Sequence, residues 1–437
     1  MIKHTIGGNI TNKSWKIVLA LLAALTASIS ALGAGANFTL GIFGNANMDD
    51  TIDEKDVAYV EGVLKGANTP TNLSDANYDG KTDSLDLAQI KLILDRDEKN
   101  LTLIDATGRI VTVDMPITKM MAYGQGFHQI VRTLKSEDLL VATDRDVQKV
   151  WSALFPELVG FPVWGSSDSR DYELIYKLHP DIFVTVVQAP QYSVSTTQQD
   201  DIEKLEPKGI KVIMLDNRHP EELQKTMRTL GYILNRRDEA EEFIDFFDGL
   251  INTITERTKA ISDKDKPRVY IANTNQYSTM GKGTSYSKYV EMAGGISISN
   301  DNPSFDGLPS TDIDPEWLIL QNPDVFVFRV GYSTIQGYGQ DNLSVAKKVQ
   351  ADVLNTPELA NVKAIKDGRV YLFGQATTEA ASFLGIGYMA KWFYPELFED
   401  LDMQAIHQEY LDRFQHIDYD VSTQGVFMYP TLYGPKD

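Results

Sequence analysis

Beyond residue 98, continuous apolar runs alternate with longer stretches in which apolar residues recur at helical spacing. Residues 101–113, LTLIDATGRIVTV, alternate apolar and polar positions on either side of a Thr-Gly turn, which predicts a β-hairpin. Continuous apolar runs predict buried strands at residues 117–122, 139–144, 181–187, 211–216, 268–274, 325–330 and 369–373. Because helical stretches separate these strands, the pattern predicts parallel sheets with helices on both faces.

Two segments of this main body repeat one another. Residues 173–184 and 316–328 both begin with Glu, place Pro seven residues later and continue into an apolar strand. Residues 209–215 and 367–373 repeat in the same order. Two matched segments in one order indicate two related lobes, residues 98–219 and 263–437.

A long helical stretch, residues 220–262, separates the two lobes. Its apolar residues recur at helical spacing from Leu223 to Ile254, and no proline interrupts them. One continuous helix is the first interpretation, and a break at Gly231 or Asn235 into two helices is the alternative. A helical connection is stiff, so we expect a cleft between the lobes with limited closure.

Residues 74–86, SDANYDGKTDSLD, carry acids and amides at alternate positions with a glycine in the middle. Calcium prefers several oxygen ligands, and a short loop supplies them from alternate positions. Gly80 permits the sharp turn that such a loop needs. The predicted calcium ligands are Asp75, Asn77, Asp79, the Lys81 carbonyl, Asp83 and Asp86.

The same pattern occurs thirty residues earlier, and an apolar stripe at helical spacing follows each copy. Asp50 stands where the other loop has Gly80, and a left-handed backbone costs Asp more than Gly, so we expect a weaker first site. A solvated acidic linker is the alternative interpretation, which the duplication disfavours. The predicted ligands of this copy are Asn45, Asn47, Asp49, the Thr51 carbonyl, Asp53 and Asp56. The predicted fold class is therefore α/β, with two lobes of parallel-type sheets joined by a long helix and preceded by a small all-α calcium-loop module at 44–97.

Residues 1–43 fit an export signal. Basic residues precede an apolar stretch, and Ala34-Gly35-Ala36 fits a small-residue cleavage pattern. An uncleaved membrane anchor is the alternative, because residues 17–43 are long enough to span a bilayer. Both interpretations predict an extracytoplasmic protein, either secreted or anchored at the cell surface.

Charge and cysteine content exclude several function classes. The 437 residues contain 61 Asp and Glu against 41 Lys and Arg, a balance that disfavours nucleic acid as a partner. The chain has no cysteine, which removes disulfides, thiolate metal sites and a cysteine nucleophile. We find no Gly-x-Ser-x-Gly elbow, Walker loop or convincing acid pair, so an enzyme is not expected.

The duplicated loop and helix at 44–97 resemble dockerin type I modules, in which an Asp closes each loop as Asp56 and Asp86 do here. The resemblance implies structural calcium and a cohesin-like partner. Modules of this kind also serve as spacers or intramolecular props.

From about residue 99 to 430 the chain resembles the substrate-binding proteins of ABC importers, in the class with a long interlobe helix. The features that carry the resemblance are the DATGR hairpin, the strand–loop–helix at 117–134, YVEMAGG, the segment 314–325 and FLGIGYMAKWFYPELF. It implies a monomer that captures a metal chelate, an iron–siderophore complex first and a corrinoid or haem next. It also implies delivery to a permease and its ATPase, with Glu173 and Glu291 as docking acids. Each acid has a plainer alternative: Glu173 as a helix-start acid and Glu291 as a solvated surface residue.

Ligands of open α/β lobes collect at the carboxyl ends of the strands, where this chain has loops rich in Gly, Ser, Tyr and amides. Arg329 is suited to pair with an anionic chelate or with a neighbouring carboxylate. His128 is suited to ligate a metal or to a structural role, and packing is the alternative for each tyrosine. The main body has only five histidines and shows no metal triad. The candidate ligand-binding residues are Tyr123, His128, Trp164, Tyr277, Tyr286, Arg329 and Tyr332.

A calcium-dependent surface interaction protein, docking through the module at 44–97, is the alternative function. Removal of this module distinguishes the two, because small-ligand affinity that survives it belongs to the lobes.

Overall fold

The computed structural model describes residues 38–187, 193–273 and 275–435. The predicted export signal therefore lies outside the described residues, apart from its last six positions. Across the described ranges, every helix is too short or too polar to cross a bilayer.

Each acidic loop leads into one helix, as the sequence predicts. Helix α2 (Glu54–Leu64) follows the first loop and α3 (Ser84–Asp95) follows the second. Asp53 and Asp83 cap these helices, and in each case the Asp three residues later completes a capping box. Strands β1 (Asn100–Ile104) and β2 (Ile110–Asp114) then form the predicted antiparallel hairpin.

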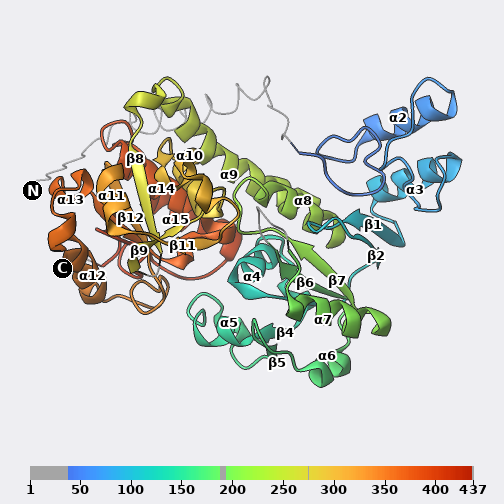
Figure 1. Ribbon diagram of the computed structural model, residues 1–437. Helices are drawn as coiled ribbons and strands as arrows, with labels where there is room; N and C mark the ends of the chain where they lie inside the picture. Colours follow the sequence, from blue (N-terminus) through green and yellow to red (C-terminus); the bar gives the residue numbers. More distant parts are fainter. Residues whose placement is uncertain (1–37, 188–192, 274, 436–437) are drawn as a thin grey trace, which may run out of the picture. The chain divides into compact units, whose positions relative to one another are not determined.

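The N-terminal lobe contains a five-stranded sheet in the order β5-β4-β3-β6-β7, and every pair in it is parallel. Its β-strands are β3 (Met120–Ala122), β4 (Leu140–Asp144), β5 (Val163–Gly165), β6 (Ile182–Val186) and β7 (Lys211–Leu215). Its helices are α4 (Gly124–Thr133), α5 (Arg145–Lys149), α6 (Tyr172–Leu178) and α7 (Thr196–Leu205). Strands β6 and β7 lie side by side (Figure 1), and their apolar runs are buried on both faces.

The C-terminal lobe contains a mixed sheet in the order β11-β9-β8-β12-β13-β14, with β10 paired to β8. Only β8, β10, β12 and β13 pair in parallel, whereas β9, β11 and β14 are antiparallel. The expected parallel-type sheet is thus correct for its centre and wrong for its outer strands β9, β11 and β14, which pair antiparallel. The strands are β8 (Arg268–Asn273), β9 (Asn275–Met280), β10 (Ile296–Ser297), β11 (Ser310–Asp312), β12 (Val325–Arg329), β13 (Val370–Phe373) and β14 (Met428–Tyr429). The helices are α10 (Ser285–Met292), α11 (Pro315–Gln321), α12 (Ser344–Leu354), α13 (Lys363–Lys366), α14 (Ser382–Phe393) and α15 (Met403–Tyr410).

The internal repeat has a shared backbone geometry. His179 ends α6 with φ 47°, and Asn322 ends α11 with φ 44°, so both helices close with a left-handed residue before the Pro-Asp step. A parallel strand follows in each lobe. His179 is therefore a helix-capping residue, and Asn322 has the same role in the second lobe.

The interlobe connection is two helices, α8 (Leu223–Ile233) and α9 (Arg237–Thr258) (Figure 1). Asn235 lies between them with φ 55°, so the predicted alternative break at Asn235 is correct. Helix α9 buries Phe243 and Phe247, and both rings contact Phe383 of α14.

A second connection between the lobes is non-covalent. The π-helical turn Leu411–Gln415 follows α15 and packs against α4 of the N-terminal lobe. Gln415 is fully buried, and its Nε2 donates to the Gln129 carbonyl at 3.2 Å and to Thr133 Oγ1 at 3.0 Å.

Candidate functional site

A hollow of about 90 Å³ opens where loops from both lobes meet. A larger hollow of about 370 Å³ adjoins it on the C-terminal lobe and shares three lining residues with it, Arg218, Gln375 and Glu379. We call the two together the cleft. The N-terminal lobe reaches the cleft through the carboxyl ends of β3, β4, β6 and β7, which is where parallel sheets place their ligands.

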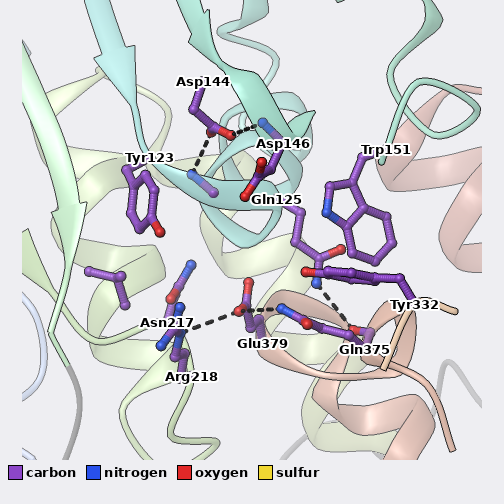
Figure 2. A pocket seen from close by; sticks show the side chains of 12 residues that line it. Tyr123, Gln125, Asp144, Asp146, Trp151, Asn217, Arg218, Tyr332, Gln375 and Glu379 are labelled. Atoms are coloured by element: carbon purple, nitrogen blue, oxygen red, sulfur yellow. Dashed lines mark hydrogen bonds and ion pairs between the residues drawn. The ribbon is translucent and has the colours of Figure 1, made fainter. Parts of the chain in front are cut away.

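Asp144 organises the N-terminal wall of the cleft. One carboxylate oxygen accepts from the backbone amides of Asp146 and Val147 and so caps α5. The other oxygen accepts from the amide of Gly124 at 2.8 Å, which fixes the start of α4 (Figure 2). The end of β4 and the loop after β3 are thereby held together.

Gln375 forms hydrogen bonds with residues of both lobes at the cleft. Its carbonyl accepts from Gln125 Nε2 at 3.1 Å across the lobes, and its Oε1 accepts from Arg329 Nη2 at 3.0 Å. Arg329 Nε is buried and has no hydrogen-bond partner among the described residues. The Arg329 guanidinium also lies 5.9 Å from the centre of the Tyr286 ring.

Arg218 and Glu379 meet at the centre of the cleft (Figure 2). Arg218 follows β7 in the N-terminal lobe, and its Nε lies 3.3 Å from Glu379 Oε1 of the C-terminal lobe. Burial opposes the charge of Arg218, but the Glu379 carboxylate outweighs it and raises the pKa of Arg218 above its usual range. Arg218 is therefore a permanent cation at this point.

Aromatic side chains wall the rest of the cleft. Trp151 and Tyr332 meet edge to face across the lobes, with ring centres 5.3 Å apart. Burial raises the pKa of Tyr332 to about 12 and raises that of Tyr123 as well. Both phenols are therefore neutral near pH 7 and able to donate hydrogen bonds.

Four of the predicted ligand-binding residues lie on the cleft: Tyr123, Tyr286, Arg329 and Tyr332. Tyr277 lies instead on a separate hollow of the C-terminal lobe, which Arg329 also lines.

The structure does not bring His128 or Trp164 to the cleft. His128 is buried within α4, where its ring nitrogens contact the Gly124 carbonyl at 2.8 Å and Thr143 Oγ1 at 3.0 Å. Burial lowers its pKa, and both nitrogens are already engaged, which fits its structural interpretation. Trp164 is fully buried in the core of the N-terminal lobe, against Phe183.

Several residues of the cleft were not among the named candidates, including Arg218, Glu379, Asn217, Gln125, Gln375, Asp144 and Trp151. The rule that ligands collect at strand ends would have found Asn217 and Arg218, which follow β7 within three residues. The same rule marks the loop 373–383 after β13, which contains Glu379, although it does not single out that residue. Nothing local marks Trp151, which contacts Tyr332 of the opposite lobe.

The two candidate docking acids lie on different lobes. Glu173 is exposed in the first turn of α6. Glu291 is exposed near the end of α10, where its carboxylate pairs with Lys288 at 2.9 Å and accepts from Asn300 Nδ2 at 2.6 Å.

The two acidic loops share a hydrogen-bond pattern. In the first, the Asp56 carboxylate accepts from the amides of Asn47 and Asp53. In the second, Asp86 accepts from the amides of Asn77 and Asp83 at the matching positions. The loops are therefore structural repeats as well as sequence repeats. In the part of the chain that the structure describes, no three His, Asp or Glu side chains are arranged to hold a metal ion.

The loops differ at their first and sixth positions. Asp75 accepts from the amides of Asp79 and Gly80, whereas Asn45 donates through Nδ2 to the carbonyls of Leu40 and Asp49. Gly80 has φ 92°.

The left-handed backbone expected at Asp50 is absent, since Met48 rather than Asp50 has a positive φ in the first loop. The Asp50 carboxylate instead forms an ion pair with Arg228 of α8, which is a reason for Asp at this position.

A model of the Periplasmic binding protein family matches residues 121–377. The molybdate-binding protein MolA of Haemophilus influenzae is 21% identical over 353 residues, which cover 75% of this chain and 92% of that protein. The crystal structure of the TroA-like periplasmic binding protein FepB from Veillonella parvula superposes with a TM-score of 0.60 at 22% identity, covering 75% of this chain and 98% of that one. MolA bound to molybdate superposes with a TM-score of 0.58 at 19% identity (73% and 98%), and CeuE of Helicobacter pylori, in a nickel–histidine complex, with 0.55 at 20% (73% and 96%). These superpositions establish the two-lobed fold.

Proposed function

The chain belongs to the periplasmic binding protein family, and on that premise we propose that it captures an anionic metal chelate outside the cytoplasm for an ABC importer. The family binds and releases solutes without covalent chemistry, in agreement with the expectation of a non-enzymatic protein. We propose an iron–siderophore type of complex first and a corrinoid or haem next. Relatives of the same fold bind molybdate and a nickel–histidine complex, which supports a ligand that contains a metal.

One observation carries this proposal. Two guanidinium groups, Arg218 and Arg329, lie in a hollow that also presents the aromatic rings of Tyr123, Tyr286 and Tyr332. Cations bind the negative groups of a chelate, and aromatic faces cover its apolar parts. The volume of the cleft suits an organic complex rather than a bare ion.

A binding panel tests the proposal. The full chain is titrated with ferric citrate, ferrioxamine B, cyanocobalamin and haemin, and tryptophan fluorescence and calorimetry report binding. We expect Arg218→Gln and Arg329→Gln to weaken an anionic chelate by about tenfold or more. Arg268→Gln is the matched control, because Arg268 lies at the opposite end of β8 from the cleft-lining Asn273. Equal affinity in all variants would contradict the proposal.

We propose that the acidic loops bind calcium through the predicted ligands and that this orders residues 44–97. Support comes from the matched hydrogen bonds of Asp56 and Asp86 and from the alternating oxygen donors. Calorimetry with calcium and with a chelator tests this proposal, since the unfolding of a calcium module must depend on the cation.

A second function, docking to a cohesin-like partner, is favoured by three exposed leucines on α2 and α3. Leu64, Leu85 and Leu92 are 44%, 57% and 39% exposed. Calcium-dependent binding of a purified cohesin domain, lost in Leu85→Ser, would support it.

A further inference from the structure

The Glu379 carboxylate reaches across from the C-terminal lobe and binds groups of the N-terminal lobe. Its Oε2 accepts from the Gly126 amide at 3.1 Å, and its Oε1 lies 3.3 Å from Arg218 Nε. Both groups are on the N-terminal lobe, whereas Glu379 is on the C-terminal lobe. Glu379 is 8% exposed. Its φ is 58°, in the left-handed region, which is energetically unfavourable for residues other than glycine.

The groups of the N-terminal lobe in this contact form an anion-binding site. Gly126 lies in the first turn of the ten-residue helix α4, where the amides are free of intrahelical partners and the helix dipole favours negative charge. Arg218 adds a full positive charge. Gly126 also permits the close approach, because a Cβ there would lie 2.6 Å from Glu379 Oε2.

Two buried acceptors beside this site have no partner. Gln125 is 3% exposed and Asn217 is 2% exposed, and both line the cleft. Among the described residues, nothing donates to Gln125 Oε1 or Asn217 Oδ1. Unpaired buried acceptors are costly, so their position indicates a ligand that brings hydroxyl or N–H donors.

We propose that Gly126 and Arg218 form a carboxylate subsite, which Glu379 occupies in the ligand-free protein and which a carboxylate of the ligand takes over. The ligand class is a metal chelate that carries a carboxylate outside the metal's coordination shell, next to a hydroxyl or N–H group that is free to donate. The displaced Glu379 then vacates the position that faces Arg218 and the amide of Gly126, and the ligand carboxylate takes it. This inference rests on the proposed capture of an anionic chelate and identifies the group that the cleft recognises.

Isosteric and truncating variants of Glu379 test the exchange. Glu379→Gln removes the charge, Glu379→Ala removes the carboxyl group, and Glu396→Gln is the control, since Glu396 is exposed on the same lobe. Calorimetry with ferric citrate is expected to show about tenfold tighter binding in both Glu379 variants, because no internal anion competes. Weaker binding in Glu379→Gln would overturn the proposal and make Glu379 a ligand contact.

Hydrogen exchange tests the subsite without a metal. Mass spectrometry of peptides covering residues 121–134 should show faster exchange in Glu379→Ala than in the wild type, and sodium citrate should restore protection. Unchanged exchange, or exchange that citrate does not slow, would overturn the subsite even if another chelate binds the cleft. Restored protection without binding of any metal chelate would support the subsite and reject the proposed chelate function.

Discussion

The Tyr232 phenol on α8 accepts a hydrogen bond from the Ile52 amide at 2.9 Å and donates one to the Ile52 carbonyl at 3.2 Å. One buried side chain thus satisfies both backbone groups of a residue inside the first acidic loop. The Asp50–Arg228 ion pair lies in the same loop contact. Arg237 of α9 adds a hydrogen bond to the Ile93 carbonyl of α3 at 2.5 Å. The module at 44–97 therefore packs against the interlobe helices α8 and α9.

Removal of the Tyr232 hydroxyl should destabilise the protein. Tyr232→Phe leaves the amide and carbonyl of Ile52 buried without partners, and we expect a loss of about 1–3 kcal/mol in the free energy of unfolding. Urea denaturation measures it. Tyr78→Phe is the control, because Tyr78 is exposed in the second loop and its ring contact with Phe43 survives the change. A difference below about 0.5 kcal/mol between the unfolding free energies of the two variants would contradict a stabilising contact between Tyr232 and Ile52.

Gly126→Ala should weaken binding of ferric citrate. The new methyl group would lie 2.5 Å from Asn217 Nδ2 and 2.6 Å from Glu379 Oε2, in the space that we assign to a ligand carboxylate. We expect at least about tenfold lower affinity by calorimetry, the opposite of the Glu379→Gln result. Gly249→Ala in α9 is the control, since a Cβ there meets nothing within 4 Å.

His407 should make the stability of the C-terminal lobe depend on pH. Its ring is fully buried between the hydroxyls of Tyr338 at 2.8 Å and Tyr433 at 2.7 Å, and burial lowers its pKa to about 3. The unfolded chain protonates this histidine below about pH 6.5, whereas the folded chain does not. The contribution of neutral, buried His407 to the free energy of unfolding is complete above pH 6.5. It is lost at up to about 1.4 kcal/mol per pH unit as the pH falls towards 3.

Urea titrations between pH 7 and pH 5 measure this slope. The His407→Gln variant should be less stable at pH 7, and the part of the slope due to residue 407 should disappear, so the difference between the two proteins should shrink towards pH 5. Parallel slopes for wild type and variant would show that the histidine is protonated in the folded protein.

Calcium should raise the unfolding temperature of the wild type by several degrees, and Asp79→Asn should reduce this shift. Asp79 is exposed, so the substitution leaves the fold intact while it removes a predicted ligand charge. Asp49→Asn tests the first loop in the same way. Differential scanning calorimetry with calcium and with a chelator makes the measurement, and Asp97→Asn, outside both loops, is the control. An identical shift in all four proteins would contradict calcium binding at these loops.

Some elements follow from the sequence because their side chains are buried on both faces. Strands β6, β7, β12 and β13 read as continuous apolar runs, and all lie where the pattern predicts them. The break at Asn235 follows from the tolerance of Asn for a left-handed backbone. The antiparallel strands β9, β11 and β14 do not follow, because pairing with a neighbour rather than their own pattern makes them strands.

The candidate site was predictable only in part. Tyr123 and Arg329 stand at the ends of apolar runs, so the strand rule finds them. Glu379 depends on Gly126 and Arg218, which are far away in sequence and on the other lobe. The role of Asp50 was equally hard to predict, since its partner Arg228 lies on α8 and no sequence feature near the loop indicates this ion pair. A one-dimensional pattern does not contain such pairings.

The bond between Gln415 and α4 has a mechanical consequence. The lobes are joined covalently through α8 and α9 and pinned again where Gln415 meets Gln129 and Thr133. These two connections add to the contacts across the cleft, such as Gln125 to Gln375 and Gly126 to Glu379, and together they restrain the movement of one lobe against the other. The cleft should therefore open as a shallow rocking motion, with an amplitude set by side chains such as Glu379 rather than by large swings of whole lobes.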